Sequence, residues 1–221
     1  MVNFTTSEEN YIKAIYRLQQ PGETVTTSGL SKELQTRPAS VTDMMKKLKA
    51  KKLLHYERYQ GFRLTPEGNK VAIGILRRHR LWEYFLAEKL KFTWDEVHEV
   101  AEDLEHVSNK KLIEKLDEFL GFPRVDPHGD PIPDASGRIL RTPLICLTEL
   151  PLNTPAAVSQ VRDQSTPVLE LLEHRKIHIG TRVEVKKKFE FDHSLELKIN
   201  RRPVFTISRE LAENIFVAYG S

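Results

Sequence analysis

The order of predicted elements in the first 65 residues constrains the fold more than any other feature. Residues 27–34 predict a short helix, residues 35–37 a tight turn, and Pro38 suits the first position of a helix that ends near residue 51. Residues 54–58 and 62–64 then predict the two strands of a β-hairpin. Two short helices followed by a hairpin are the elements of a winged helix-turn-helix, whose second helix enters the major groove of double-stranded DNA.

The charge of this N-terminal part favours an anionic partner. Residues 1–75 contain 12 Lys and Arg against 7 Asp and Glu, which gives a net charge of +5. Basic side chains would contact phosphates, while small polar side chains at the start of the second helix would approach base edges. The predicted DNA-contacting residues are Thr27, Arg37, Pro38, Ala39, Ser40, Thr42, Asp43, Lys46, Lys47, Arg58 and Tyr59.

Two later predicted helices carry histidine and glutamate. His79 and Glu83 are four residues apart on the first helix and therefore share one face. A capping box at residues 93–96 would open the second helix, which carries four such residues at steps of 4, 3 and 1, within roughly a 100° arc. They are His98, Glu102, Glu105 and His106. Imidazoles and carboxylates without a thiolate suit Mn²⁺, Fe²⁺, Zn²⁺ or Co²⁺. The alternative interpretation is a solvated charged face.

Composition describes an ordinary globular chain of 221 residues, 39% of them hydrophobic and 29% charged. No apolar run reaches the roughly 20 residues that span a bilayer. The N-terminal sequence MVNFTTSEEN lacks the features of a signal peptide. The single cysteine, Cys146, cannot form an internal disulfide, which favours a reducing compartment. We therefore expect a cytoplasmic protein without a membrane partner.

Changes in composition divide the sequence into three predicted domains. Residues 1–74 form the winged helix-turn-helix, and residues 75–147 form a helical domain that ends in a Pro- and Gly-rich connector. Residues 148–221 contain short alternating segments that favour a small β-barrel. The predicted fold class is therefore mainly α with a small β domain. The helical domain has more apolar surface than a small module can cover, which favours a homodimer; packing within one chain is the alternative.

Six motifs are distributed over nearly the whole chain. They are SEENYIKAIYRL, RPASVTDMMKKLKAKKLL, YQGFRLTPEG, RRHRLWEYFL, EVAEDLEHVS and PHGDPIP. In this order the chain resembles the diphtheria toxin repressor family, which includes iron-dependent and manganese-dependent regulators. The resemblance implies a metal-dependent repressor that binds palindromic operator DNA as a homodimer, controls metal-ion homeostasis genes and ends in an SH3-like barrel. It implies neither enzymatic activity nor an organic substrate.

The resemblance also implies which residues hold metal. A primary site would use the positions that match Asn10, Glu102, Glu105 and His106. An ancillary site would use the positions that match His79, Glu83 and His98. In the iron-type members the C-terminal domain completes this ancillary site, and Asp163 or Gln164 lies in the matching segment.

Three positions depart from the family's patterns. Asn10 and Glu102 stand where iron-type members have sulfur ligands, and such oxygen donors favour Mn²⁺ or Fe²⁺, with Zn²⁺, Co²⁺ or Ni²⁺ as substitutes in vitro. Lys13 stands where the manganese type has an acidic residue, and an ammonium group cannot ligate a cation. Two rival interpretations are a winged-helix regulator that responds to a small organic ligand and a metalloenzyme built on the His/Glu cluster.

Overall fold

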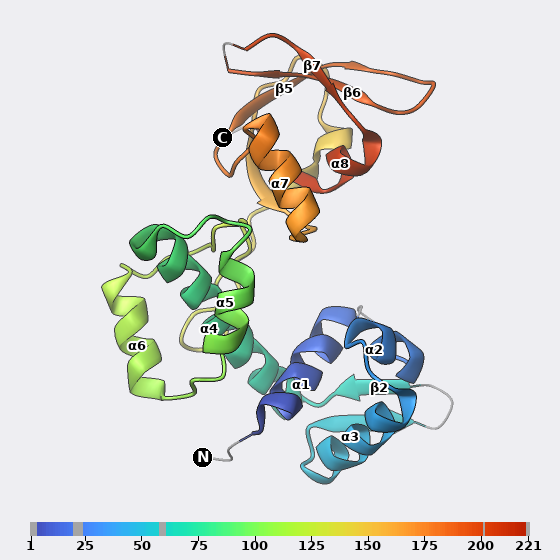
Figure 1. The fold of residues 1–221 in the computed structure, drawn as a ribbon, viewed down its shortest axis with the longest axis vertical. Helices are drawn as coiled ribbons and strands as arrows, with labels where there is room; N and C mark the ends of the chain where they lie inside the picture. Colours follow the sequence, from blue (N-terminus) through green and yellow to red (C-terminus); the bar gives the residue numbers. More distant parts are fainter. Residues whose placement is uncertain (1–3, 20–23, 58–60, 201, 220–221) are drawn as a thin grey trace. The chain divides into compact units, whose positions relative to one another are not determined.

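The computed structural model describes residues 4–19, 24–57, 61–200 and 202–219, and it divides the chain into two compact units (Figure 1). Unit 1 comprises Met1–His79, Asp103–Glu114 and Pro133–Arg138. Unit 2 comprises Arg80–Glu102, Lys115–Ile132 and Ile139–Ser221. The long helix α4, Pro66–Leu90, belongs to unit 1 up to His79 and to unit 2 from Arg80 onward.

Unit 1 contains the winged helix-turn-helix that the sequence predicts. Its elements are α1 (Thr6–Leu18), α2 (Thr27–Glu33), α3 (Pro38–Ala50), β1 (Leu54–Glu57) and β2 (Gly61–Leu64). The two strands pair antiparallel, with Leu54 opposite Leu64. Of the predicted DNA contacts on the hairpin, Arg58 and Tyr59 lie outside the described residues.

Hydrophobic spacing explains how α3 is held. Pro38 occupies its first turn, where the missing N–H is not needed, and Val41, Met45 and Leu48 follow at helical intervals and are buried. Each such side chain stabilises the fold by about 1.5–3 kcal/mol when fully buried. They pack in one core with residues of α1, including Ile12. The opposite face of α3 is therefore left exposed.

The helical part continues with α5 (Val97–Leu104) and α6 (Lys110–Phe119). The sequence predicts one helix through His106, and this boundary is wrong because α5 ends at Leu104 and a turn follows. In that turn the Val107 N–H donates to the Leu104 carbonyl at 3.1 Å, a three-residue step that closes the helix. Glu105 and His106 therefore lie on a turn. No helix in the described part of the chain combines the length and apolar composition that crossing a bilayer requires.

The C-terminal part of unit 2 is a six-stranded antiparallel sheet with strand order β3-β8-β4-β5-β6-β7. The strands are β3 (Ile145–Cys146), β4 (Ala156–Val161), β5 (Arg182–Lys188), β6 (Leu195–Ile199), β7 (Phe205–Ile207) and β8 (Ile215–Ala218). The helices are η1 (Leu147–Glu149), α7 (Thr166–Arg175) and α8 (Arg209–Glu213). Alternation explains β6, because Leu195, Leu197 and Ile199 are buried in one core while the residues between them face outward.

A capping box at the start of α1 gives the first testable prediction. Glu8 accepts a hydrogen bond from the Thr5 N–H at 3.0 Å, and the Lys51 ammonium lies 2.6 Å from its Oε1. Burial alone would raise the pKa of Glu8, but the Lys51 and Thr5 hydrogen bonds outweigh it and lower that pKa. We expect Glu8→Gln to reduce the free energy of unfolding by about 1 kcal/mol at pH 7.

The pH dependence follows from the direction of that shift. A carboxyl whose pKa folding lowers stabilises the native state above its unfolded pKa of about 4.3, and this contribution disappears as the pH falls through the folded value. Urea unfolding should therefore separate wild type from Glu8→Gln at pH 7 and bring them together near pH 3. Glu33→Gln, at an exposed position on α2, should behave like wild type at both pH values. An equal difference at both pH values for Glu8→Gln would show that the charge of Glu8 contributes nothing.

Candidate metal centre and DNA-binding face

Unit 2 brings three buried ligand groups together. Glu83 lies on α4, and Asp126 and His128 lie in the loop that follows α6. One ligand atom from each of the three residues lies within 4.8 Å of the other two. None of them is more than 3% exposed, so the cluster is closed to bulk water.

The loop of residues 126–130 has a fixed conformation. Asp126 Oδ1 accepts the N–H groups of His128 at 2.9 Å and Asp130 at 3.0 Å, which folds the loop around this carboxylate. Gly129 has a φ of +88°, and a Cβ there would lie 1.9 Å from the Ser159 carbonyl oxygen. The Val161 N–H, at the end of β4, donates to the His128 carbonyl at 2.9 Å. The sheet therefore holds the loop that carries two of the three groups.

The hydrogen bonding of His128 makes this residue a fitting metal ligand. Its Nε2 lies 2.8 Å from the Trp94 carbonyl oxygen, which can only accept, so Nε2 carries the proton. In the neutral ring Nδ1 then holds a lone pair, and this buried atom has no hydrogen-bond partner among the described residues. It lies 3.8 Å from Glu83 Oε1. A ligating histidine commonly donates its second N–H to a carbonyl in this way.

Negative charge is concentrated around Asp126. Burial, and then the charges of Glu83 and Asp130, raise the pKa of Asp126 well above its usual range, although Arg80 acts in the opposite direction. Two unit charges held within 4.8 Å of each other repel by about 3 kcal/mol or more at an effective dielectric constant of about 20. Arg80 also bonds Asp130, with Nη2 3.2 Å from Oδ2, and its Nε is 3.6 Å from Asp126 Oδ2. A divalent cation fits this donor set and this charge.

His98 lies beside the same cluster. Its Nδ1 is 3.1 Å from Glu83 Oε1, and its Nε2 is 3.6 Å from Glu102 Oε1. Glu102 is about half exposed, on the outer side of His98. Of the predicted metal ligands, Glu83, His98 and Glu102 are therefore adjacent within unit 2.

One ligand atom each of His79, Glu83 and His98 also lies within 4.8 Å of the other two, so the structure brings together the three residues predicted for the ancillary site. Glu105, His106 and His79 lie in unit 1, where they contact residues of α1 and one another, as described below. Asp163 is exposed, and its carboxylate accepts the Ser165 N–H at 2.9 Å.

Asn10 and Gln164 are the last two of the predicted metal ligands. Asn10 is half-buried on α1. The Gln164 Nε2 donates to Asp130 Oδ2 at 3.1 Å, which brings the segment of residues 163–164 to the ligand-bearing loop.

The sequence interpretation missed Asp126 and His128, which it left in a connector. The DPHGD sequence of residues 126–130 holds an acidic residue and a histidine two positions apart, next to a glycine. That pattern is the one local indication of a ligand-bearing turn. Its partner Glu83 is more than 40 residues away, so spacing alone could not join them.

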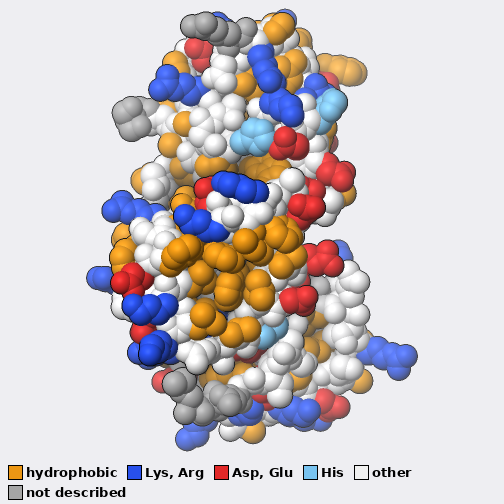
Figure 2. Space-filling view, turned by 60° about the vertical axis from the view of Figure 1, so that its left-hand side comes forward, with side chains coloured by type: hydrophobic (Ala, Val, Ile, Leu, Met, Phe, Trp, Pro, Cys, Tyr) orange, Lys and Arg blue, Asp and Glu red, His pale blue; other side chains and the backbone are white. Residues whose placement is uncertain are grey.

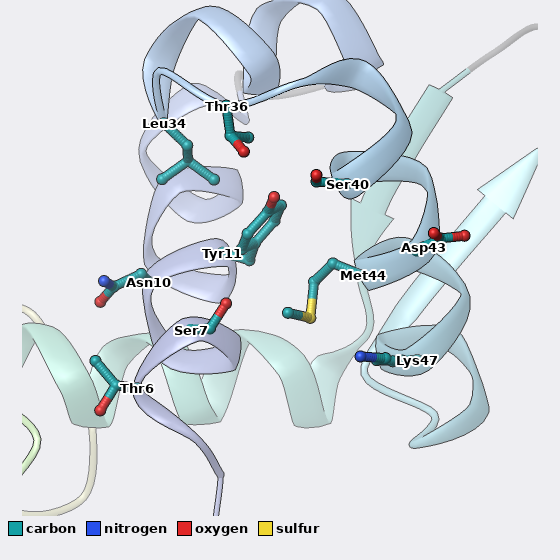
Figure 3. Close-up of a pocket in the computed structure, with 10 residues that line it drawn as sticks. All are labelled: Thr6, Ser7, Asn10, Tyr11, Leu34, Thr36, Ser40, Asp43, Met44 and Lys47. Carbon is teal, nitrogen blue, oxygen red and sulfur yellow. The ribbon is translucent and has the colours of Figure 1, made fainter.

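The predicted DNA-reading face of α3 is exposed. Ser40, Asp43 and Lys47 line a groove together with side chains of α1, among them Ser7 and Tyr11 (Figure 3). Figure 3 shows Ser7 and Tyr11 directed toward α3, and Asn10 also lines this groove from α1.

The surrounding positions are also open to a partner. Lys46 is exposed and pairs with Asp43 at 3.1 Å. Arg37, Pro38, Ala39 and Thr42 are exposed as well, and Thr27 begins α2. These side chains are free to approach a duplex.

Known protein families match all three parts of the chain. Residues 3–62 match the N-terminal DNA binding domain of iron dependent repressors, and residues 65–134 match their metal binding and dimerisation domain. Residues 145–219 match the FeoA domain. Fold, buried ligand cluster and matches together define a metal-dependent, DNA-binding transcriptional repressor, a class without enzymatic activity.

Individual relatives agree with this class. The iron-dependent repressor IdeR of Mycobacterium leprae is 30% identical over 167 residues, which cover 72% of each chain. The transcriptional regulator MntR of Oceanobacillus iheyensis is 32% identical over 118 residues, covering 53% of this chain and 80% of that protein. The chain belongs to the diphtheria toxin repressor family, in the branch that carries a FeoA domain.

Solved structures show the same architecture. A manganese-dependent transcriptional repressor in complex with manganese superposes with a TM-score of 0.85 at 29% identity, covering 96% of this chain and 99% of that one. ScaR with bound Cd²⁺ superposes with a TM-score of 0.79 at 31% identity and the same coverage. The winged helix, the helical part and the β-rich C-terminal part are thus those of this family.

The close approach at Gly129 provides the second testable prediction. Gly129→Ala forces a side chain into a left-handed conformation and against the Ser159 carbonyl. We expect a loss of about 3 kcal/mol in the free energy of unfolding and at least about tenfold weaker Mn²⁺ binding, because the loop must move. Thermal unfolding and calorimetric titration measure both quantities.

Gly74→Ala is the matched control. Gly74 is helical, and a Cβ there would meet no described atom within 4 Å. Alanine in a helix is favoured over glycine, so this variant should gain about 0.5–1 kcal/mol and bind Mn²⁺ like wild type. Normal metal binding by Gly129→Ala would show that the loop conformation does not shape the centre.

Proposed function

We propose that Glu83, Asp126 and His128 bind the regulatory divalent ion, with His98 next to it, and that this ion raises affinity for operator DNA. The buried lone pair of His128 Nδ1 beside two buried carboxylates carries the proposal. A proton-free imidazole nitrogen and carboxylate oxygens are the donors that such ions require. When bound, the ion neutralises the charge that Glu83 and Asp126 otherwise place in a dry site.

The donor chemistry supports Mn²⁺ or Fe²⁺ as the ion. The cluster offers only nitrogen and oxygen donors, and the one cysteine, Cys146, lies in β3, where its sulfur accepts a hydrogen bond from Thr148 at 3.1 Å. Softer metals therefore have no thiolate to bind. Relatives named for iron and for manganese agree with this choice, and Zn²⁺, Co²⁺ or Ni²⁺ would substitute in vitro.

The C-terminal domain takes part in the proposed switch by holding the ligand-bearing loop. Gln160 and Gln164 both donate to the Asp130 carboxylate, at 2.5 and 3.1 Å. Asp163, next to Gln164, is proposed as a further oxygen donor to the ion. Because a ligand that prefers one arrangement stabilises it, metal binding and DNA binding strengthen each other reciprocally.

The proposed partner is a palindromic operator bound by a homodimer. The family domain that spans residues 65–134 carries the dimerisation function. Hydrophobic side chains gather in a broad patch on the face shown in Figure 2. Leu90, Phe92, Phe119 and Phe122 are exposed in unit 2, as a dimer interface requires.

Two further features of the proposal concern domain organisation and setting. We propose a functional division at residues 1–74, 75–147 and 148–221, which is supported by family matches over residues 3–62, 65–134 and 145–219. We place the protein in the cytoplasm, where it would control genes of metal-ion homeostasis without a membrane partner or an organic substrate.

The third prediction tests the proposed centre. His128→Ala should weaken Mn²⁺ binding about 100-fold and abolish the increase in DNA affinity that Mn²⁺ produces. The DNA is a duplex enriched from a randomised pool in the presence of Mn²⁺, and fluorescence anisotropy with Mn²⁺ or with chelator measures its affinity. His174→Ala, at an exposed position on α7, is the control and should keep the full response.

The outcomes separate two parts of the proposal. A full Mn²⁺ response in His128→Ala would remove this residue from the centre. Equal enrichment of the same duplex by wild type with Mn²⁺ and with chelator would leave DNA binding intact but contradict the metal switch.

The fourth prediction concerns the DNA-reading face. Lys46 is exposed and placed to neutralise a phosphate, so Lys46→Ala should reduce the slope of log K against log salt by about one. Anisotropy titrations at about four salt concentrations between roughly 50 and 200 mM measure this slope. Lys110→Ala, on α6, removes the same charge outside the winged helix and should leave the slope unchanged. Equal slopes for all three proteins would exclude a phosphate contact by Lys46.

A further inference from the structure

A second buried polar cluster fastens α1 to the turn that follows α5, entirely within unit 1. We call it the α1 cluster. Its members are Glu9, Lys13, Arg78, His79, Glu105 and His106. It includes two of the four residues that the sequence places in a primary metal site, Glu105 and His106. The contacts of these side chains show whether a divalent ion fits among them.

Glu105 is fully buried and already has a cation. The Lys13 Nζ lies 2.7 Å from its Oε1, and the side chain of Lys13 is only 6% exposed. The Nδ1 of His79 lies 2.7 Å from Oε2. Burial would raise the pKa of Glu105, but His79 and Lys13 together lower it, so this carboxylate is charged, and its Oε1 accepts a hydrogen bond from Lys13.

Glu9 has a comparable set of contacts. Its Oε1 lies 2.7 Å from the Arg78 Nη2, and its Oε2 lies 2.6 Å from the His106 Nδ1. Arg78 also donates through Nε to the Glu105 backbone carbonyl at 2.5 Å. The guanidinium therefore joins α4 to both α1 and the turn.

The charges of the α1 cluster balance without an added ion. Two carboxylates, Glu9 and Glu105, face two permanent cations, Lys13 and Arg78. The imidazoles of His79 and His106 add no negative charge. A divalent ion at Glu105 would have to displace an ammonium at 2.7 Å or remain beside it in a site that excludes water, and an ammonium offers no lone pair. The residues present do not fit a metal ion.

The other two residues of the predicted primary site are Asn10 and Glu102. Asn10 offers a neutral amide and lies near Thr6 and Ser7 on the surface of α1 (Figure 3). Asn10 therefore adds no negative charge to the α1 cluster. Within unit 2, the Glu102 carboxylate lies 3.6 Å from His98.

We propose that Lys13 is a built-in counterion that takes the place of a metal ion at the α1 cluster. Helix α1 is then fastened to residues 105–106 whether or not metal is present, and each chain takes one regulatory ion instead of two. The location of that single ion at Glu83, Asp126 and His128 rests on the proposed function. The role of Lys13 does not, because it follows from contacts within unit 1.

The test counts Mn²⁺ ions bound to the full chain after removal of metal with a chelator. Equilibrium dialysis with metal analysis should give one ion per chain for wild type. Lys13→Glu replaces the ammonium with a carboxylate next to Glu9, Glu105 and His106, and the count should rise to two. Arg17→Glu makes the same charge change at an exposed position of α1, and its count should stay at one.

A second measurement does not depend on the folding of Lys13→Glu. Glu105→Gln in the otherwise unchanged chain should still bind one Mn²⁺, because the α1 cluster holds none. Lys13→Met should lower the Tm of the metal-free protein by about 10 °C, because it leaves the Glu105 carboxylate buried without its ammonium. Arg17→Met should leave that Tm unchanged.

The possible outcomes test the role of Lys13 and the proposed metal centre at His128 separately. Two ions in wild type, with one lost in Glu105→Gln, would overturn the proposal that Lys13 takes the place of a metal ion. An unchanged count in folded Lys13→Glu would also overturn it. No ion in wild type but one in Lys13→Glu would support the counterion while contradicting the proposed centre at His128.

Discussion

The energetic cost of a buried carboxylate is the constraint on which the rest of this structure depends. An ionised carboxylate loses several kcal/mol of hydration when water is excluded, a large part of the net stability of a whole domain. Among the described residues, carboxylates are buried most completely in two places, and their surroundings differ. Glu105 meets the Lys13 ammonium directly, whereas Asp126 lies beside the Glu83 carboxylate with the Arg80 guanidinium 3.6 Å away. The first arrangement already contains its cation, and the second is the one proposed to receive a metal ion.

This difference separates the structural role of α4 from its sensing role. On α4, Arg78 and His79 belong to the α1 cluster. Arg80 and Glu83, within the next helical turn, belong to the proposed metal centre. If α1 is held permanently, metal-dependent change has to arise where the charge is unbalanced, at the loop of residues 126–130. The Val161 N–H of β4 donates to the His128 carbonyl in that loop, so the C-terminal domain holds part of the proposed sensor.

Sequence patterns within a few residues were enough to predict the winged helix. The candidate metal centre depends on contacts between residues that are far apart in the sequence. Pro38 and the spacing of buried residues on α3 act within a few residues, and the structure agrees with them. Helical spacing also singled out Glu83 and His98. Asp126 and His128 escaped prediction because their loop is shaped by the contact between Gly129 and Ser159, 30 residues later in the chain. Nor could periodicity show that α5 ends at Leu104, since the burial of Glu105 depends on Lys13, 92 residues away.

The number of ions per chain limits how strongly metal can control DNA affinity. A tenfold coupling between one ion and the DNA corresponds to about 1.4 kcal/mol. A homodimer with one ion per chain therefore gains about 100-fold when both couplings add, whereas two ions per chain would give about 10,000-fold. The Hill coefficient of metal activation also cannot exceed the number of sites, which is two for such a dimer. By supplying Lys13, the chain gives up part of this steepness and gains a winged helix that stays attached to its helical support at low metal concentration.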